Sequence, residues 1–397
     1  MKVVVLAAAY PSPAEPERAL FIESLTRELA SGPDTTVASV VAPWVHPGDP
    51  RLEVRQGIRV RRFPTATGGR RLKEIERPGP LLLAAHALSA ASALLSEVRS
   101  SRADLILAHW ILPSGPIAAM VSRLLRVPCV LVAHGSDVHR YAQGRGVLHR
   151  AARWAVRRSS RVVAVSRELR SVLVSHLGAV EARAPVIPMG ADAAHFPFPP
   201  VPRSPADRAL LRQKLGVPGD APLLLFVGDW IEAKGVLDLI EALRALRRDG
   251  IAFAAAFAGA GPLEEALRPA ARELGLLLPG RLPQAEVARW MRAADLFVLP
   301  SHSEGTPVSI LEALASGTAV LATRVGGIPE VVEEGSNGWL VPPGDPRALS
   351  AALASVLGDP RRLEEARARI ERSSEDLTAG RRARELRRVL EEVLRGA

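Results

Sequence analysis

Cysteine is almost absent from this 397-residue sequence. The one thiol, Cys129, excludes an intrachain disulfide, and its place in an apolar Val-Pro-Cys-Val-Leu-Val run favours a buried, unreactive side chain. Aromatic residues are also scarce, at 4% of the chain, so few side chains could stack on bases, and no nucleic-acid-binding motif occurs. We therefore expect no nucleic-acid partner and a reducing compartment such as the cytoplasm.

Long hydrophobic runs are missing as well. The longest apolar helical segment, residues 81–95, is shorter than the roughly 20 residues that span a bilayer, and His86 interrupts it. The apolar run that follows Lys2 leads into a proline-rich segment, which favours a first strand over a signal peptide. With 48% hydrophobic and 24% charged residues, the composition is typical of a globular protein of two or three domains.

Positive charge prevails only in the first half of the chain, although the net charge is +10 overall. Residues 1–200 hold 26 basic and 15 acidic side chains, whereas residues 201–397 hold 26 and 27. One interpretation is a protein that is peripheral at the inner face of a membrane, where its basic surface meets anionic lipid or another acidic acceptor. The other is an arginine-rich composition without a partner, and the sequence leaves both open.

Short runs rich in Val, Ile and Leu alternate with helix-period segments through both halves. In the first half we expect strands at residues 2–8, 36–42, 58–63, 104–108, 129–133, 161–165 and 185–187, and helices at 18–30, 81–99, 115–126, 147–158 and 168–176. In the second half we expect strands at 223–227, 252–258, 295–299 and 319–322, and helices at 236–248, 263–274, 284–293, 308–315, 346–357, 361–372 and 379–394. Apolar strands separated by helices predict parallel sheets that are covered on both faces.

The prolines between residues 196 and 205 interrupt this alternation and predict an interdomain linker. The fold class is therefore α/β, with two Rossmann-like parallel-sheet domains facing across a cleft. The predicted domains are residues 1–198 and 206–375, and residues 376–397 form a last helix. Ligands of such sheets bind beyond the carboxyl ends of the strands.

The most informative stretch is residues 301–317, Ser-His-Ser-Glu-Gly-Thr-Pro-Val-Ser-Ile-Leu-Glu-Ala-Leu-Ala-Ser-Gly. It opens a helix near Pro307, whose missing N–H costs nothing at that position. Glu304 lies in the loop, and Glu312 lies two turns later inside an apolar helix, where an unpaired charge is expensive. Two carboxylates and the amides of a helix N-terminus predict a receptor for a sugar and a diphosphate, with ribose hydroxyls as partners of Glu312. The alternative is an ordinary loop acid and a helix-surface acid.

Three other strand ends carry polar or glycine-rich turns. Gly228 ends one strand and Lys234 precedes the next helix, which suits close backbone approach and a cation for phosphate oxygens. His134 ends another strand, with Asp137 close behind, and a histidine there can donate a hydrogen bond to a sugar hydroxyl. The turn at residues 258–262 lacks the third glycine of a dinucleotide fingerprint, so a redox cofactor is not expected. A solvated lysine and a turn-capping histidine are the structural alternatives.

In company, these motifs resemble those of a known family. The pattern comprises residues 134–137, 188–192, 226–235, 258–262, the Glu304-x7-Glu312 pair and the Gly-Gly-Ile-Pro-Glu run at 326–330. It resembles the retaining, nucleotide-sugar-dependent glycosyltransferases of the GT-B fold, family 4, also called group 1. The resemblance covers nearly the whole chain, and it implies that the last helix crosses back onto the first domain.

The resemblance places the donor contacts in the second half. Glu304 would contact sugar hydroxyls near the reacting carbon, and Glu312 would hold the ribose. The other donor-binding residues that it implies are Gly228, Asp229, Lys234, Arg281, Leu282, Gly305, Thr306 and Val308. Backbone amides of the last three would cradle the diphosphate, and residues 281 and 282 would meet the base.

The family usually has an arginine beside the lysine that neutralises the diphosphate. Here that position is Asp229, so another cation must compensate, and Arg324 is the candidate by position in the sequence. No Asp-x-Asp occurs anywhere in the chain, so a metal site is not expected, and Lys234 with the helix amides would do the electrostatic work of a metal. No cofactor is implied.

On the acceptor side, the resemblance implies that His134 hydrogen-bonds the donor sugar, while His109 and Asp137 line the acceptor site. His134, Lys234 and Glu304 are thus the expected catalytic residues. The implied substrates are a nucleotide-diphosphate sugar and an acceptor, which is a glycan, a lipid-linked saccharide or a small molecule. An inactive GT-B scaffold that binds a nucleotide or glycan, and a nucleotide-sugar epimerase of the same fold, remain alternatives.

Overall fold

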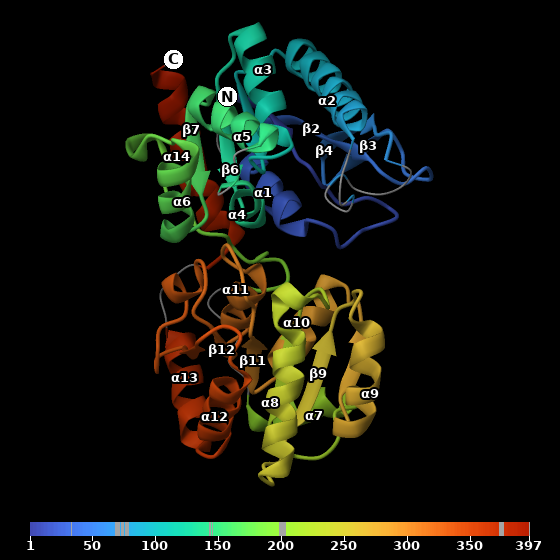
Figure 1. Ribbon diagram of the computed structural model, residues 1–397, viewed down its shortest axis with the longest axis vertical. Helices are drawn as coiled ribbons and strands as arrows, with labels where there is room; N and C mark the ends of the chain where they lie inside the picture. The colour runs from blue at the N-terminus through green and yellow to red at the C-terminus, as the bar shows by residue number, and fades with distance from the viewer. Residues whose placement is uncertain are drawn as a thin grey trace. The chain divides into compact units, whose positions relative to one another are not determined.

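The computed structural model describes residues 1–32, 34–67, 72, 75, 79–142, 144, 146–197, 204–372 and 377–396. The chain divides into two compact units, which we call unit 1 (Met1–Pro188 with Ala379–Ala397) and unit 2 (Met189–Thr378). Each unit is a parallel-sheet α/β structure, as the sequence predicts (Figure 1).

The first boundary lies at residue 188 instead of the predicted 198. Residues 189–197 fold with unit 2, because the Ala191 N–H donates a hydrogen bond to the Leu377 carbonyl oxygen and Phe196 is completely buried. Most of the predicted linker, residues 198–203, lies outside the described part of the chain. Its last proline is not linker but the first residue of helix α7 (Pro205–Lys214), which Ser204 caps through a capping box.

Unit 1 contains a seven-stranded sheet. Its strands are β1 (Lys2–Leu6), β2 (Thr36–Trp44), β3 (Leu52–Arg55), β4 (Ile58–Pro64), β5 (Leu105–His109), β6 (Cys129–Ala133) and β7 (Arg161–Ala164). Their spatial order is β3-β4-β2-β1-β5-β6-β7, and only β3 runs antiparallel to its neighbour. The sequence analysis missed β3, which is short and largely exposed at the sheet edge. The predicted strand at 185–187 is wrong, because it forms only one bridge, between Ala164 and Val186.

Helices cover both faces of this sheet. They are α1 (Leu20–Ala30), α2 (Pro80–Ser101), α3 (Ser114–Leu125), the short α4 (Ser136–Ala142), α5 (Val147–Arg158), α6 (Arg167–Leu177) and α14 (Ala379–Arg395). Helix α2 connects β4 to β5, α3 connects β5 to β6, and α5 lies between β6 and β7, so all three connections run toward the β7 edge of the sheet. Because such connections are right-handed, the three helices lie on the same face. They pack side by side there, and α1 packs on α14 (Figure 1).

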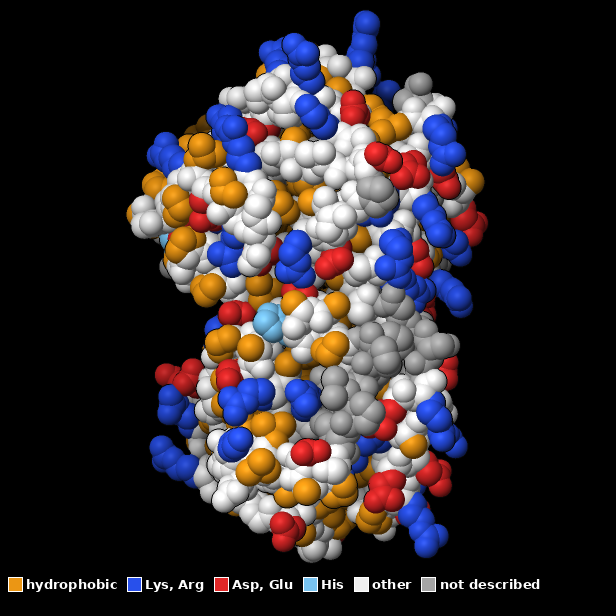
Figure 2. All heavy atoms as spheres, turned by 180° about the vertical axis from the view of Figure 1, so that it is seen from behind, with side chains coloured by type: hydrophobic (Ala, Val, Ile, Leu, Met, Phe, Trp, Pro, Cys, Tyr) orange, Lys and Arg blue, Asp and Glu red, His pale blue; other side chains and the backbone are white. Residues whose placement is uncertain are grey.

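Seen from behind the view of Figure 1, the surface of unit 1 shows more basic than acidic side chains (Figure 2). Inside, α14 contributes Leu386, Leu390 and Val393 to the core cluster that contains Val3 and Val5 of β1. The C-terminal helix is therefore a structural part of unit 1, although unit 2 separates it from the rest in sequence.

Unit 2 contains six parallel strands in the order β10-β9-β8-β11-β12-β13. They are β8 (Leu223–Val227), β9 (Ala254–Ala258), β10 (Leu277–Gly280), β11 (Leu296–Leu299), β12 (Ala319–Thr323) and β13 (Gly338–Val341). Its helices, besides α7, are α8 (Val236–Arg248), α9 (Glu264–Leu274), α10 (Gln284–Ala293), α11 (Val308–Ala315), α12 (Pro346–Leu357) and α13 (Pro360–Arg372). The connections change direction between β8 and β11, which makes this the topological switch point of the sheet.

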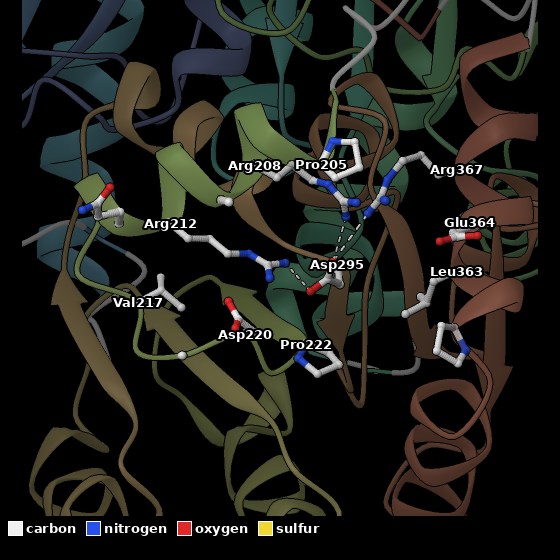
Figure 3. A pocket seen from close by; sticks show the side chains of 14 residues that line it. Pro205, Arg208, Arg212, Val217, Asp220, Pro222, Asp295, Leu363, Glu364 and Arg367 are labelled. Atoms are coloured by element: carbon white, nitrogen blue, oxygen red, sulfur yellow. Dashed lines mark hydrogen bonds and ion pairs between the residues drawn. The ribbon is translucent and has the colours of Figure 1, made fainter.

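An ion cluster holds the opposite, amino-terminal edge of this sheet. Asp295, just before β11, accepts hydrogen bonds from Arg208 of α7 at 2.9 Å, from Arg212 and from the Leu223 N–H at 2.7 Å. Arg367 of α13 lies 3.7 Å away (Figure 3). The cluster borders a pocket of about 480 Å³ whose lining also includes Asp220 and Glu364, so its acidic and basic residues balance. It binds helices α7 and α13 to the sheet, at the edge opposite to the strand ends that carry the sequence motifs.

The place of α14 in the core of unit 1 can be tested by truncating Leu390, which is completely buried. Leu390→Ala should lower the free energy of unfolding by about 3 kcal/mol, through lost burial and a residual cavity. Urea unfolding followed by circular dichroism measures this loss. Leu394→Ala, at a partly buried position on the same helix, is the matched control and should lose much less. Equal, small losses in both variants would contradict the packing of α14 described above.

Candidate functional site

The turns after β8 and β11 meet at the switch point of unit 2. Gly235, between Lys234 and α8, has a φ of 64°, and a Cβ there would overlap the carbonyl oxygen of Pro300. Only glycine permits this approach, because any other side chain would collide with the backbone that leads to Glu304. The turn therefore places Lys234 directly beside the loop that carries Glu304.

Glu304 is held from two sides. Lys234 Nζ donates to Glu304 Oε1 at 2.5 Å, and the hydroxyl of the fully buried Ser301 donates to the same oxygen at 2.7 Å. The side chains of Lys234 and Glu304 are 25% and 10% exposed, so the pair is largely shielded from water. The sequence analysis named both members but not their ion pair, because Lys234 and Glu304 stand 70 residues apart. It also gave no role to Ser301, although this residue lies only three positions before Glu304.

Glu312 lies on the buried side of α11. Its Oε1 accepts a hydrogen bond from Gln284 Nε2 at 3.0 Å, which gives the carboxylate a partner in α10 that the sequence analysis missed. Burial raises the pKa of the Glu312 carboxyl to about 7, and the nearby Asp192 raises it further, while the bond from Gln284 lowers it. Hydroxyl donors that reach this carboxylate would favour its charged form.

Asp229 has a cationic partner, and it is not Arg324. Arg281 Nη2 lies 3.0 Å from Asp229 Oδ1, whereas Arg324 lies 3.6 Å from a carboxylate oxygen of Glu334. Arg281, instead of the Arg324 that the sequence analysis suggested, is thus the cation that pairs with Asp229 in this structure. β8 and β10 flank β9, so the turns that follow them lie close enough for the pair to form. Arg281 and Asp229 are half exposed, and the pair contributes little stability by itself.

The N-terminus of α11 completes the half-site of unit 2. Pro307, at the N-cap position, supplies no capping side chain, and Gly305 and Thr306 lie buried before it while Val308 begins the helix. Gly327 N–H donates to the Gly305 carbonyl oxygen at 2.6 Å, which fixes the loop from the neighbouring turn. The positive end of the helix dipole thus adjoins Lys234 and Glu304.

The other predicted donor residues lie at the same edge of the sheet. Gly228 follows β8, and its N–H is bonded to the Ala258 carbonyl oxygen at 3.0 Å. Leu282 is half-buried between Arg281 and α10. Among the described residues, no group of three or more His, Cys, Asp or Glu side chains could hold a metal ion.

In unit 1, two histidines from neighbouring strand ends form one hydrogen bond. His109 Nδ1 lies 3.0 Å from His134 Nε2, and the rings of Phe21 and Trp110 lie 5.2 and 5.1 Å from that of His134. Burial lowers the pKa of His109 to about 3 and that of His134 well below its usual range, and Arg382 of α14 lowers both further. Both rings are therefore neutral at physiological pH.

The neutral pair has a preferred arrangement of protons. His109 Nε2 is buried and has no hydrogen-bond partner in the described chain, so a proton there would be an unsatisfied buried donor. We therefore assign the proton of His109 to Nδ1, from which it is donated to His134 Nε2. His134 then carries its own proton on Nδ1 and presents a neutral donor.

Asp137 fastens the loop that carries His134. Its Oδ1 accepts from the N–H groups of His134 and Gly135, both at 3.0 Å, and its Oδ2 accepts from Ile111 N–H at 2.6 Å. Burial raises the pKa of Asp137 to about 6, although these bonds lower it. His109 is 0% exposed and Asp137 is 5% exposed. His109 and Asp137, which the sequence analysis assigned to the acceptor side, are therefore buried. They hold His134 in position through hydrogen bonds to its ring and to its backbone.

Comparison with known proteins identifies the family. A model of glycosyl transferases group 1 matches residues 207–376, and one of glycosyltransferase family 4 matches residues 21–195. The teichuronic acid biosynthesis glycosyltransferase TuaC of Bacillus subtilis is 32% identical over 89% of this chain and 88% of its own. The chain belongs to the group 1 glycosyltransferases. The present chain is also 31% identical to D-inositol 3-phosphate glycosyltransferase of Xylanimonas cellulosilytica, over 86% of its own length and 83% of the length of that relative.

Solved structures confirm the GT-B fold of this transferase. HepE from Anabaena, solved in complex with UDP, superposes with a TM-score of 0.74 at 20% identity and covers 99% of this chain and 100% of its own. Sucrose-phosphate synthase from Thermosynechococcus elongatus gives a TM-score of 0.79 at 20% identity, with full coverage of both chains. The expectation of a group 1 glycosyltransferase, and hence of an enzyme, is confirmed.

The raised pKa of Glu312 predicts a pH-dependent stability. As pH rises from 4.5 to 7, the unfolded chain loses this proton while the folded chain keeps it, so the folded state becomes less stable. Glu312→Gln removes the ionisation and should raise the free energy of unfolding by about 2 kcal/mol near pH 8.5, with little change near pH 4.5. Urea unfolding at the two pH values measures the difference. The exposed Glu241→Gln is the control, and parallel pH profiles for Glu312→Gln and the parent protein would show that Glu312 is not perturbed.

Proposed function

We propose that this enzyme is a retaining, metal-independent glycosyltransferase that uses a nucleotide-diphosphate sugar. The Lys234–Glu304 pair at the switch point, beside the N-terminus of α11, carries this proposal. It combines a cation for phosphate oxygens with a carboxylate for sugar hydroxyls, at the sheet edge where α/β proteins bind ligands. The complexes of HepE with UDP and with UDP-glucose support the same class of donor.

Donor binding would redistribute the charges at this site. The diphosphate carries two negative charges next to the helix amides and Lys234, so Lys234 would turn from Glu304 toward the phosphate oxygens. Glu304, still bonded to Ser301, would then accept hydrogen bonds from the donor sugar. Lys234 and the α11 amides would stabilise the departing diphosphate, as a divalent ion does in other transferases.

The transfer step would retain the anomeric configuration. The bond between the anomeric carbon and the diphosphate oxygen breaks, the acceptor oxygen bonds to the same face of that carbon, and the acceptor proton passes to a leaving-group oxygen. His134 would donate a neutral hydrogen bond to the sugar during this step.

The relatives and the charge of the chain support a proposal for the acceptor class and the location. TuaC and the D-inositol 3-phosphate glycosyltransferase are named for the synthesis of a polysaccharide and for a small phosphorylated acceptor. We propose an acceptor that is a glycan, a lipid-linked saccharide or a small molecule. The buried lone thiol and the basic residues of unit 1 support a cytoplasmic enzyme that is peripheral at the inner face of a membrane.

A panel of nucleotide sugars tests the proposed donor class. The purified protein should release nucleoside diphosphate from at least one member, slowly by hydrolysis without acceptor, and this release should persist in the presence of a metal chelator. A thermal-shift screen with the matching nucleoside diphosphates identifies the base, because a ligand that binds the folded state raises Tm. Binding without any turnover would overturn the proposal in favour of an inactive scaffold, and conversion of the sugar without transfer would indicate an epimerase.

Glu304→Gln separates the roles of the two paired residues. We expect turnover to fall by about a hundredfold, because the amide no longer accepts the charged hydrogen bonds of the sugar. Affinity for nucleoside diphosphate should hold or rise, since Lys234 is released from its ion pair. Kinetics of donor hydrolysis and calorimetric titration measure the two effects.

Lys234→Gln is the matched control and should weaken nucleoside diphosphate binding by about tenfold or more. If Glu304→Gln keeps turnover within about twofold of the parent enzyme, the carboxylate does not act on the sugar.

A further inference from the structure

The helices that cover one face of unit 1 expose no acidic side chain. Helices α2, α3 and α5 contain a single carboxylate, Glu97, which is 2% exposed and bonded to Arg61 at 3.1 Å. The same helices expose six arginines: Arg99, Arg123, Arg150, Arg153, Arg157 and Arg158. Within the described part of the chain, none of these six forms an ion pair. The exposed side of these three helices is therefore positively charged, with no exposed acidic side chain on the same helices to balance the arginines.

Large apolar side chains are exposed on the same three helices. Of the twelve that are exposed in the described chain, seven lie here: Leu81, Leu88, Met120, Leu124, Val147, Leu148 and Trp154. On α5, Val147 and Trp154 share the exposed side with Arg150 and Arg157, opposite the buried Ala152. An amphipathic surface of arginine, tryptophan and aliphatic residues is typical of a helix that lies in a membrane interface.

A pocket of about 410 Å³ opens beside α5. Its lining includes Arg153, Arg157, Arg161 and Arg183 and no acidic residue. The nearest carboxylate in sequence, Glu181, is 72% exposed and lies 3.7 Å from Arg170 instead. Planar guanidinium groups match the oxygens of a phosphate group, which would supply the missing negative charge.

Several arginines elsewhere in the described chain have acidic partners, unlike the six on these helices. The three around Asp295 share a pocket with two further acidic residues (Figure 3). The pocket beside α5, by contrast, has four arginines and no acidic residue in its lining.

We propose that the outer face of α2, α3 and α5, here called the basic helical face, lies on an anionic bilayer. A lipid phosphate enters the pocket of Arg153, Arg157, Arg161 and Arg183, while Trp154 and the exposed aliphatic side chains enter the interface. This inference rests on the proposal that the enzyme works at a membrane. It adds which surface meets the membrane and the chemical group that the surface binds.

Helix α2 lies along this surface and does not cross the bilayer. Its 22 residues are long and apolar enough to span a membrane. However, α2 packs on β1, β2, β4 and α3, and it buries His86 and Glu97 against unit 1. Its exposed large apolar side chains, Leu81 and Leu88, are available to lipid.

Vesicle sedimentation with the full chain tests the basic helical face. The parent protein should bind vesicles of equal parts phosphatidylglycerol and phosphatidylcholine, bind phosphatidylcholine alone much less, and lose binding as salt rises. The double variant R153Q/R157Q should lower the partition coefficient about twentyfold, since each arginine near an anionic surface contributes about fivefold. Trp154→Ala should weaken binding without changing its salt dependence.

The matched control is R268Q/R272Q, which removes the same charge from α9 of unit 2 and should leave vesicle binding unchanged. Equal binding to both vesicle types, or an equal loss in both double variants, would overturn the proposal. A third outcome would also overturn it: the protein does not bind vesicles, but inorganic phosphate raises its Tm, and this rise is lost in R153Q/R157Q. That result would show a site for free phosphate.

Donor hydrolysis measured on the same samples separates the two proposals. Turnover without vesicle binding would overturn only the proposal that the basic helical face binds a membrane. Vesicle binding without turnover would overturn only the proposed transfer reaction. Circular dichroism checks that each variant is folded, which we expect because the substituted arginines are exposed.

Discussion

The half-site of unit 2 depends on how closely two turns approach each other at the switch point of one sheet. The turn after β8 touches the end of β11 because Gly235 has no side chain, and this contact brings Lys234 to Glu304. A second contact, at Gly326, holds the backbone of Glu304 from the turn after β12. Backbone contacts thus set the geometry of an ion pair between two largely shielded side chains.

Both half-sites use burial to control charge. In unit 2, Glu312 and Glu304 stand in shielded surroundings, yet Glu304 has a cation and a hydroxyl donor while Glu312 has only an amide. In unit 1, burial and Arg382 keep His109 and His134 neutral, and the Asp137 carboxylate satisfies three backbone N–H groups. The result is a neutral histidine pair in unit 1 and a cation beside helix amides in unit 2.

Sequence periodicity predicted most strands and helices, and several, such as α8, α10, α11 and α12, with the bounds that the structure has. It failed for short or exposed elements, including β3, β10, β13 and α4, because a strand of four residues leaves little pattern to read. It also took Pro205 for linker, although proline equally begins a helix after a capping serine. The site prediction named Lys234, Glu304 and Glu312 but missed Ser301, Gln284 and the pairing of Arg281 with Asp229. Gln284 and Arg281 come from other segments, so no local signal marks them, whereas Ser301 lies only three residues before Glu304 and its bond depends on the conformation of the loop.

By itself, the sequence determined the α/β alternation, the residues that end each strand and the family resemblance. These depend on local patterns, such as apolar runs, turn residues and the spacing of two glutamates along one loop and helix. Tertiary structure alone decided that Lys234 is bound to Glu304, that Arg281 instead of Arg324 meets Asp229, and that His109 lies behind His134. Those outcomes depend on distances between segments far apart in the chain and on the burial of charged groups, because the strength of an ion pair and the pKa of an acid follow from the surroundings that folding creates.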